Sequence, residues 1–229
     1  MLGVLVNTLT VLLGSSIGLI FQKGIPDKVT KAAMTGIGLC TMYIGIDGLM
    51  QGNNVLILIA STIIGVIIGT LLDIDGKINS LGGYVEKRFS KKGGKTPVAQ
   101  GFVTASLLFC IGSMTIVGSL ESGLTGDNSM IYTKSLLDLV SSSMLAATLG
   151  YGVMIASVFV LVFQGALVLL AGLLQPLLTD MAIAEMICSG SLIILALGLN
   201  ITGITKIKVA DYLPAIFVAP LVCFIIALF

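Results

Sequence analysis

The sequence predicts an all-α, polytopic membrane protein, and its composition and its long apolar runs are the observations that predict it. Hydrophobic residues make up 56% of the 229 positions, charged residues make up only 10%, and the mean hydropathy is +1.12. A surface this poor in polar groups cannot be solvated by water, so lipid must cover most of it. We expect residues 1–229 to form a single transmembrane domain.

Seven apolar runs are long enough to cross the hydrocarbon core, which needs about 20 residues of helix. An eighth segment, residues 134–149, is shorter and carries Asp138 and three serines, so hydropathy leaves it open as a span, a half-helix or a surface helix. The seven runs cover residues 2–21, 32–50, 54–72, 100–119, 152–175, 184–201 and 212–229.

Loop charges favour the interpretation in which the eighth segment crosses the membrane. All but one of the 12 basic residues lie in three loops, at residues 23–31, 77–95 and 206–208. The positive-inside rule places these loops in the cytoplasm, which requires an even number of crossings between the second and the third. The sequence therefore predicts eight spans, both termini outside and a basic cytoplasmic loop at residues 73–100. Seven spans, with the last two lysines outside, remain the alternative.

Motifs of the common enzyme classes are absent from the sequence. It has no histidine, no GxSxG nucleophile elbow, no GxxxxGK[ST] phosphate loop and no HExxH zinc motif. The four cysteines lie inside apolar runs without CxxC spacing, which is typical of packing residues. A net charge of +1 gives no general attraction to nucleic acid. We therefore expect no enzyme activity, no metal, no cofactor and no nucleic-acid partner.

An offset of 153 residues indicates an internal repeat. It lays GLCTMYIGID at residues 38–47 over SLIILALGLN at residues 191–200, which matches Gly45 with Gly198 and Asp47 with Asn200. A competing register pairs CIGSM at residues 110–114 with CSGSL at residues 188–192. With eight spans, both registers give repeats of opposite orientation, which is the inverted-repeat arrangement of many transporters.

The glycine- and serine-rich stretch GSMTIVGSLESGLTG, residues 112–126, predicts a break in the fourth span. Free backbone groups are tolerated at membrane depth only where protein buries them or a water-filled cavity solvates them, so a break indicates a lined cavity. The alternative is that these small residues let neighbouring helices approach closely, as GxxxG spacing does elsewhere in the chain. The candidate site residues in this stretch are Gly112, Ser113, Thr115, Gly118 and Ser119.

Four charged residues follow or flank the glycine-rich stretch and form the strongest candidate site. They are Glu121, Asp127, Lys134 and Asp138, and the last two are spaced to face each other on one side of a helix. A salt bridge between them would let the segment enter the membrane nearly neutral, and the other two acids would bind a cation, carry a proton or repel anions. The alternative is a polar outer loop followed by a charged helix start.

The other acids are expected to lie where water reaches them, with one exception. Asp47 lies near the outer end of the second span, and a buried charge there should face a cavity, with Asn200 as its repeat counterpart. A solvated span end is the alternative for Asp47. The acids expected in loops or at span ends are Asp27, Asp73, Asp75, Glu86, Asp180, Glu185 and Asp211.

At these residues the chain resembles the YdfK/YqgA-like family of small bacterial inner-membrane proteins of unknown function. The resemblance covers nearly the whole chain, and it rests on GVLVNTLTVLLGSSIG near the amino terminus, on FCIGSMTIVGSLESGLTGD at residues 109–127 and on KSLLD at residues 134–138. It implies a bacterial inner-membrane location and supplies no activity. It also implies that the glycine-rich stretch and the four charged residues belong to the family pattern.

These observations together favour a membrane transporter, either a secondary carrier or a facilitator, for a small polar solute or ion. The chain is small for a transporter, so we expect a homodimer that uses glycine-rich faces as interfaces. The same polar residues would serve a channel if they line a continuous pore. A third hypothesis is a scaffold or sensor without transport, whose basic loop docks a cytoplasmic partner.

Overall fold

The computed structural model describes residues 1–22, 27–80, 98–111, 113–176 and 178–227, and throughout these ranges it is helical without strands. Five helices are long and apolar enough to cross a membrane, and the number rises to seven if each of two bent helix pairs is one span. The predicted all-α class, with several helices able to span a membrane, is confirmed. Most of the predicted basic loop, residues 81–97, lies outside the described residues.

The chain divides into two compact units, which are described separately. Unit 1 comprises Met1–Met34 and Ile78–Gly172, and unit 2 comprises Thr35–Lys77 and Leu173–Phe229. Three of the described helices run from one unit into the other: α2 (Asp27–Leu49), the short α9 (Ala171–Leu174) and the helix Ile74–Ser80.

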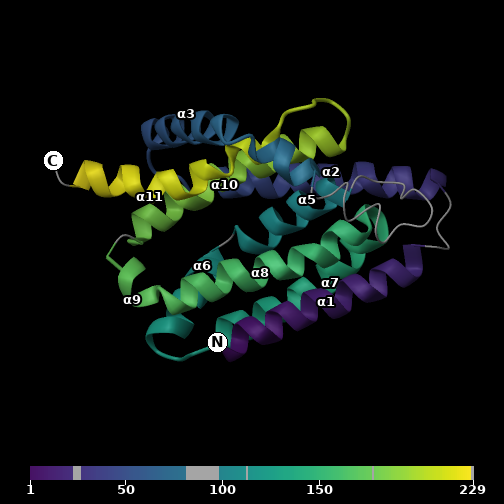
Figure 1. The fold of residues 1–229 in the computed structure, drawn as a ribbon, viewed down its shortest axis with the longest axis horizontal. Helices are drawn as coiled ribbons and strands as arrows, with labels where there is room; N and C mark the ends of the chain where they lie inside the picture. The colour runs from purple at the N-terminus through teal and green to yellow at the C-terminus, as the bar shows by residue number, and fades with distance from the viewer. Residues whose placement is uncertain (23–26, 81–97, 112, 177, 228–229) are drawn as a thin grey trace. The chain divides into compact units, whose positions relative to one another are not determined.

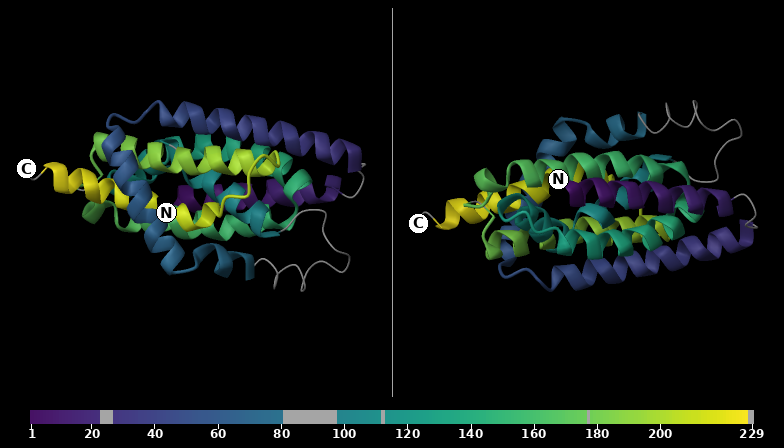
Figure 2. Two further views of the ribbon diagram at one scale, coloured as in Figure 1. Left: turned by 90° about the horizontal axis from the view of Figure 1, so that it is seen from above. Right: turned by 90° about the horizontal axis from the view of Figure 1, so that it is seen from below.

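Unit 1 is a helix bundle in which α1 (Leu2–Gln22) and α7 (Ser129–Leu149) lie side by side (Figures 1 and 2). Gly3 of α1 approaches Asn128, Gly14 approaches Leu139, and Gly18 approaches the backbone of residues 143–147. Residue numbers rise together along both helices, so the two helices run parallel. Each has 21 residues, about 31 Å at 1.5 Å per residue, so the segment left open by hydropathy is a full-length helix beside α1.

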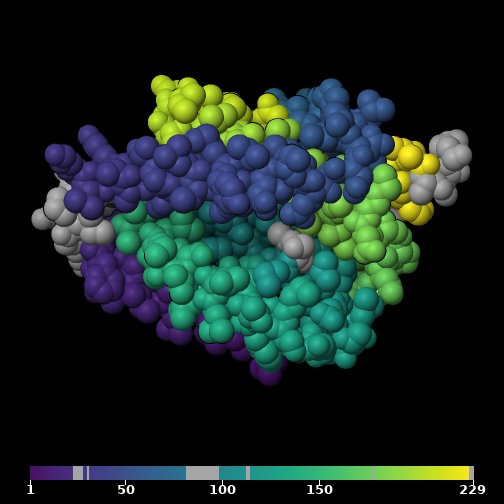
Figure 3. Space-filling model, turned by 180° about the vertical axis from the view of Figure 1, so that it is seen from behind, coloured from purple at the N-terminus to yellow at the C-terminus, as the bar shows by residue number. Residues whose placement is uncertain are grey.

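Helix α7 carries its polar residues on the inside and its apolar residues on the outside. Lys134 and Asp138 are buried within unit 1, whereas Leu136 is 67% exposed and Met144 is 65% exposed. The outer surface of α7 appears in teal green in the space-filling view (Figure 3). A helix in water shows the reverse pattern, so an apolar solvent must surround this face. The partition also explains why average hydropathy underestimates this helix.

The predicted break in the glycine-rich stretch is confirmed. Helix α5 (Val98–Cys110) ends before the break and α6 (Ser113–Leu124) begins after it, with the two axes bent by 59°. Both halves follow α8 (Tyr151–Leu169), because Gly101 approaches Gly152 at one end and Gly123 approaches Val168 at the other. The two helices together are long and apolar enough for one interrupted span or for a re-entrant loop.

Unit 2 packs the second half of α2 with α3 (Val55–Leu71), α10 (Asp180–Ile201), the 3₁₀ turn η1 (Val209–Tyr212) and α11 (Pro214–Ala227). Helices α2 and α10 are antiparallel, since Gly38 approaches Ile201 whereas Gly48 approaches Ser191. Helix α3 is followed by a second helix, Ile74–Ser80, at a bend of 52°.

The two plain GxxxG faces serve packing within the chain. A Cβ on Gly14 or Gly18 would overlap the backbone of α7, and a Cβ on Gly65 or Gly69 would overlap Ala215 or the backbone of Asp211. This confirms that these glycines let neighbouring helices approach closely. Both faces are covered inside their own units, so the predicted dimer cannot use them as its interface.

Candidate functional site

The centre of unit 1 holds an ion pair between Lys134 and Asp138. The spacing of four residues puts both side chains on the inner face of α7, where each is only 8% exposed. Helices α1, α5 and α8 contain no Asp, Glu, Lys or Arg, and α6 contains only Glu121. The pair therefore lies among helices that carry almost no charged residues, so each member has only the other to compensate its charge.

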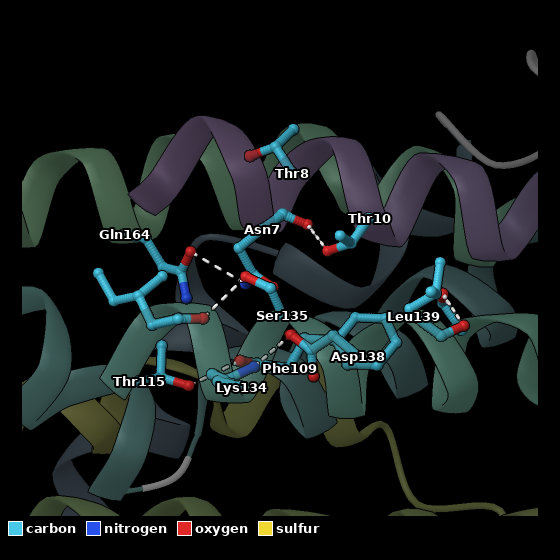
Figure 4. A network of polar contacts seen from close by, with 12 residues as sticks. Asn7, Thr8, Thr10, Phe109, Thr115, Lys134, Ser135, Asp138, Leu139 and Gln164 are labelled. Atoms are coloured by element: carbon cyan, nitrogen blue, oxygen red, sulfur yellow. Dashed lines mark hydrogen bonds and ion pairs between the residues drawn. The ribbon is translucent and has the colours of Figure 1, made fainter. Parts of the chain in front are cut away.

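Two amide side chains from other helices complete the polar cluster around this pair. Asn7 of α1 and Gln164 of α8 are both fully buried, and the Asn7 Nδ2 donates to Gln164 Oε1 over 3.1 Å. The Asn7 side chain also lies within reach of the Asp138 carboxylate. Figure 4 shows the side chains converging from α1, α7 and α8. Three helices thus contribute to one polar site.

The broken helix contributes the remaining side of the site. The Lys134 ammonium lies 5.8 Å from the centre of the Phe109 ring, close enough for a cation–π contact. The Thr115 hydroxyl donates to the carbonyl of Phe109 over 2.9 Å, and so satisfies an acceptor that the helix break sets free. Figure 4 places Thr115, Phe109 and Lys134 beside one another.

Several buried polar atoms in unit 1 have no hydrogen-bond partner within the described part of the chain. Near the pair they include Asn7 Oδ1 and Gln164 Nε2. Buried polar groups are almost always satisfied, and leaving one unpaired costs about 1–3 kcal/mol, so a polar ligand or water is expected to complete them. The unpaired hydroxyls in the same unit are those of Ser15, Thr104, Ser106 and Ser119.

The site lies below the helix ends rather than at them. Lys134 is five residues into α7 and Asp138 is nine, which places them about 7.5 and about 13.5 Å from the start of the helix. Asn7 is five residues into the parallel helix α1, at a similar depth. If these ends mark the edge of a hydrocarbon core about 30 Å thick, the whole cluster lies inside the membrane.

The other candidates of the glycine-rich stretch divide between packing and surface. Thr115 and Ser119 are buried, and Gly118 packs against Met130 and Ile131 on α7. Glu121 is half-buried on α6. Gly112 and the side chain of Ser113 lie outside the described residues.

Asp127 lies in the exposed turn between α6 and α7 and is not part of the cluster. The hydroxyl and the backbone N–H of Ser129 both donate to its carboxylate, over 2.6 and 2.9 Å, and hold the pKa of Asp127 below its usual value. These bonds form an Asx turn that leads into α7. Asp127 therefore fits the alternative interpretation, a polar outer loop, better than it fits a ligand site.

Asn128 joins three elements at the same end of unit 1. Its Oδ1 accepts from the backbone N–H of Gly3 over 3.2 Å and from the Ser122 hydroxyl over 2.8 Å. The start of α1 is thereby tied to the α6–α7 turn. This contact keeps Asn7 and the inner face of α7 in register.

Asp47 and Asn200 belong to unit 2. Asp47 is exposed on α2, in agreement with the solvated-end alternative. The Asn200 side chain accepts from the Thr205 hydroxyl and the Ile207 N–H and donates to the Ile207 carbonyl, over 2.7, 2.9 and 2.7 Å. All these bonds close the turn after α10, so Asn200 has a structural role.

Two acids that the sequence placed within reach of water are buried. Glu185 is fully buried, and its Oε1 accepts from the N–H groups of Asn53 and Asn54 at the start of α3, over 2.6 and 2.7 Å. Asp211 is 4% exposed, and its Oδ1 accepts from the N–H of Asp75 over 2.9 Å. The prediction was wrong for these two residues because each side chain folds back to satisfy a helix start in its own unit.

Asn7 and Gln164 were not predicted as site residues, although the sequence contains a pattern that points to them. Each is a lone amide in the middle of an otherwise plain apolar run. Such a side chain is costly in lipid and has to find a partner inside the bundle. The repeat offset of 153 residues would have laid Asn7 four residues, about one helical turn, before Gln164.

Comparisons with known proteins place the chain in a family. A family model described as "Protein of unknown function (DUF554)" matches residues 2–224. The "Uncharacterized membrane protein YdfK" of Bacillus subtilis (strain 168) is 34% identical over 233 residues, covering 100% of this chain and 98% of that protein. The "Uncharacterized protein YqgA" of Escherichia coli (strain K12) is 31% identical over 222 residues, covering 95% of this chain and 94% of that protein. No solved structure matches. The chain thus belongs to the DUF554 family, in agreement with the YdfK/YqgA-like resemblance of its sequence.

Proposed function

We propose that this protein is a membrane transporter, a secondary carrier or facilitator, that moves a small polar solute or ion through the site in unit 1. The observation that carries the proposal is the buried Lys134–Asp138 pair with the unpaired amide atoms of Asn7 and Gln164 beside it. Buried polar atoms without a protein partner are expected where water or a polar solute completes them. A site that receives a polar solute needs them.

The energetics of burial support a functional reason for the pair. Two charges removed from water regain at most the cost of their desolvation, and hydrophobic residues of the same volume are often neutral or more stabilising by about 1–4 kcal/mol. Stability alone therefore gives little reason to keep Lys134 and Asp138 in an apolar bundle. Ionisable residues inside a membrane are by default candidates for transport or proton transfer.

The helix directions support eight crossings. In unit 1, α1 and α7 run parallel, and the α5–α6 pair and α8 run opposite to them, because Gly150 at the start of α8 lies near Gln22 at the end of α1. Alternating crossings of eight spans require these directions. With the loop charges, the same alternation supports a topology in which both termini lie on the outer side of the membrane.

The contacts between α2 and α10 support the inverted repeat at the offset of 153 residues. Gly45 approaches Leu195, and its counterpart Gly198 approaches Met42, which is the counterpart of Leu195. Gly48 likewise approaches Ser191, whereas the counterparts Gly38 and Ile201 approach each other. Reciprocal contacts of this kind are expected where a pseudo-two-fold axis relates two helices.

Reconstitution into proteoliposomes tests the proposal. Uptake is measured for a panel of labelled anions, cations, zwitterions and neutral polar solutes, with empty vesicles as the baseline. We expect saturable uptake and counterflow of at least one class, and loss of both in the double variant Lys134→Met with Asp138→Leu. Asp127→Asn, which removes an acid outside the cluster, is the matched control and should transport normally.

Uptake by the double variant at the wild-type rate would show that the pair is structural and would overturn the proposal. Flux that never saturates and shows no counterflow would identify a channel instead of a carrier. The double variant is preferred to a single one because it leaves no unpaired charge in the bundle.

A further inference from the structure

The polar cluster of unit 1 has hydrogen-bond donors that no acceptor among the described residues fills. A lysine ammonium has three N–H donors, and the one acceptor found for Lys134 in the described part of the chain is Asp138. The Nε2 of Gln164, with two further N–H donors, has no partner. On the acceptor side, Asn7 Oδ1 is unpaired, and the Asp138 carboxylate accepts from Lys134 and Asn7. A solute with acceptor oxygens would fill the vacant donors of Lys134 and Gln164.

The broken helix adds positive potential to the same place. Thr115 is the third residue of α6, so its bond to Phe109 fixes the amino-terminal end of this 12-residue helix next to the ring on which Lys134 rests. A helix amino terminus carries roughly half a positive charge on its free N–H groups. In transporters, half-helix amino termini of this kind face anionic groups of the substrate.

The charge balance decides what must accompany an anion. Among the described residues of unit 1, the charged group that faces Asp138 is Lys134 on its own helix, since α1, α5 and α8 lack charged residues and the single acid of α6, Glu121, lies six residues beyond Thr115, toward the loop. The one further titratable group that interacts with the pair is the Cys110 thiol. The site is therefore neutral when empty and would carry a net negative charge with an anion bound.

We propose that this site binds a small monovalent carboxylate together with one proton. The inference rests on the proposed transport function and names its substrate class. The solute carboxylate replaces the Asp138 carboxylate as the partner of Lys134 and accepts from Gln164, and Asp138 takes up one proton from water. One positive and one negative charge are present before and after the exchange, so the loaded site crosses the membrane without net charge. The solute carboxylate has the same charge and acceptor geometry as the Asp138 carboxylate that it replaces beside Lys134.

The first test measures binding by thermal stabilisation of the detergent-purified full chain, with acetate and lactate as probes. Asp138→Asn leaves Lys134 without a negative partner, as in the protonated state. We expect this variant to bind acetate about 100-fold more tightly than the wild type, the equivalent of about 2.8 kcal/mol at 1.4 kcal/mol per tenfold. Lys134→Met with Asp138→Leu should bind neither probe, and the sodium salt of each is compared with sodium chloride to separate a general salt effect.

The second test measures the pH dependence of binding, which a merely structural role would not change. Above roughly pH 6 the probes stay ionised. Uptake of one proton per anion then weakens acetate binding to the wild type by up to tenfold for each unit of pH increase, whereas Asp138→Asn should bind acetate equally at every pH. In proteoliposomes an inward proton gradient should drive lactate accumulation by the wild type in excess of that in protein-free vesicles, which take up some free acid unaided, and Asp138→Asn should catalyse exchange without this excess.

Two results would overturn the inference. One is an Asp138→Asn variant that folds but binds acetate no more tightly than the wild type, and the other is wild-type binding that does not change with pH. Saturable uptake of a cation or a neutral solute, with none of acetate or lactate, would also overturn it and leave the proposed transport function standing. Absence of uptake for every class of solute would refute both.

Discussion

Replacing Lys134 by Met leaves the Asp138 carboxylate buried without its charged partner. Both side chains are only 8% exposed, so solvent does little to screen the remaining charge. Removing one member of a buried pair costs about 3–5 kcal/mol, whereas an exposed pair contributes about 0–1 kcal/mol. At about 2–4 °C per kcal/mol for a chain of this length, the midpoint of thermal unfolding should fall by about 6–20 °C. Asp138→Leu should cost a similar amount.

The double variant with Met and Leu should recover most of this loss. It places two apolar side chains of similar volume in an apolar bundle, a change that is often neutral or stabilising. The single costs sum to at least about 6 kcal/mol, while the double variant is expected within about 1 kcal/mol of the wild type or above it. The four proteins are compared by thermal unfolding in one detergent, with Asp127→Asn as the control.

The result that would refute this reasoning is additivity. If the double variant loses as much as the two single variants together, the side chains act separately and the buried pair is not a unit. Single variants that lose less than about 1 kcal/mol would indicate an exposed pair instead. Recovery of stability without recovery of transport would separate the structural cost of the pair from its function.

Further predictions concern packing, pH and the turn after α10. Gly18→Ala puts a Cβ into the backbone of α7 and should lower the free energy of unfolding by about 1–3 kcal/mol, measured by thermal unfolding. Gly36→Ala is the control, because its Cβ meets no atom within 4 Å, and it should not lower this free energy. Equal effects of the two variants would contradict the close approach of α1 and α7. The pKa of Asp127 is lowered in the folded chain, so its stabilising contribution is present above about pH 3.9, the ordinary value for Asp, and is lost as the pH falls through the lower folded value. The protection of the Ser129 amide against hydrogen exchange, taken relative to its intrinsic rate at each pH, should therefore fall in acid, and Asp127→Asn should remove that change. Asn200→Ala deletes three hydrogen bonds of the turn and should lower the unfolding free energy by about 1–3 kcal/mol without altering solute binding, and a loss of binding would place this residue in a site after all.

Much of the fold could be predicted because membrane crossing imposes simple rules. Long apolar runs gave the spans, and the glycine-rich stretch gave the interruption between Cys110 and Ser113, since both depend on local composition. Helix α7 was the uncertain case. Averaged along the helix, its polar inner face and apolar outer face cancel, and only the partition between Lys134 on one side and Leu136 on the other identifies it as a bundle helix.

The site was only half predictable, for a different physical reason. The Lys134–Asp138 pair follows from helical spacing, which is local. Glu185 and Asp211 are buried because helix starts far away in sequence need acceptors, and no local pattern reveals where such a start will lie. Hydropathy could place these acids only relative to span ends. It carries no information about the backbone N–H groups that they accept from.

Asn7 and Gln164 show what a lone polar residue in an apolar run can indicate. Each amide occupies a face that would otherwise be apolar, and leaving an amide unpaired in lipid costs more than any packing that it provides. The structure pairs the two amides through one bond, Asn7 Nδ2 to Gln164 Oε1, and leaves the other half of each amide open toward a charged pair. A purely structural amide pair would be most stable with both bonds made between the two side chains. The single bond leaves one acceptor and one donor unpaired, which is the arrangement expected where a polar solute or water completes the network.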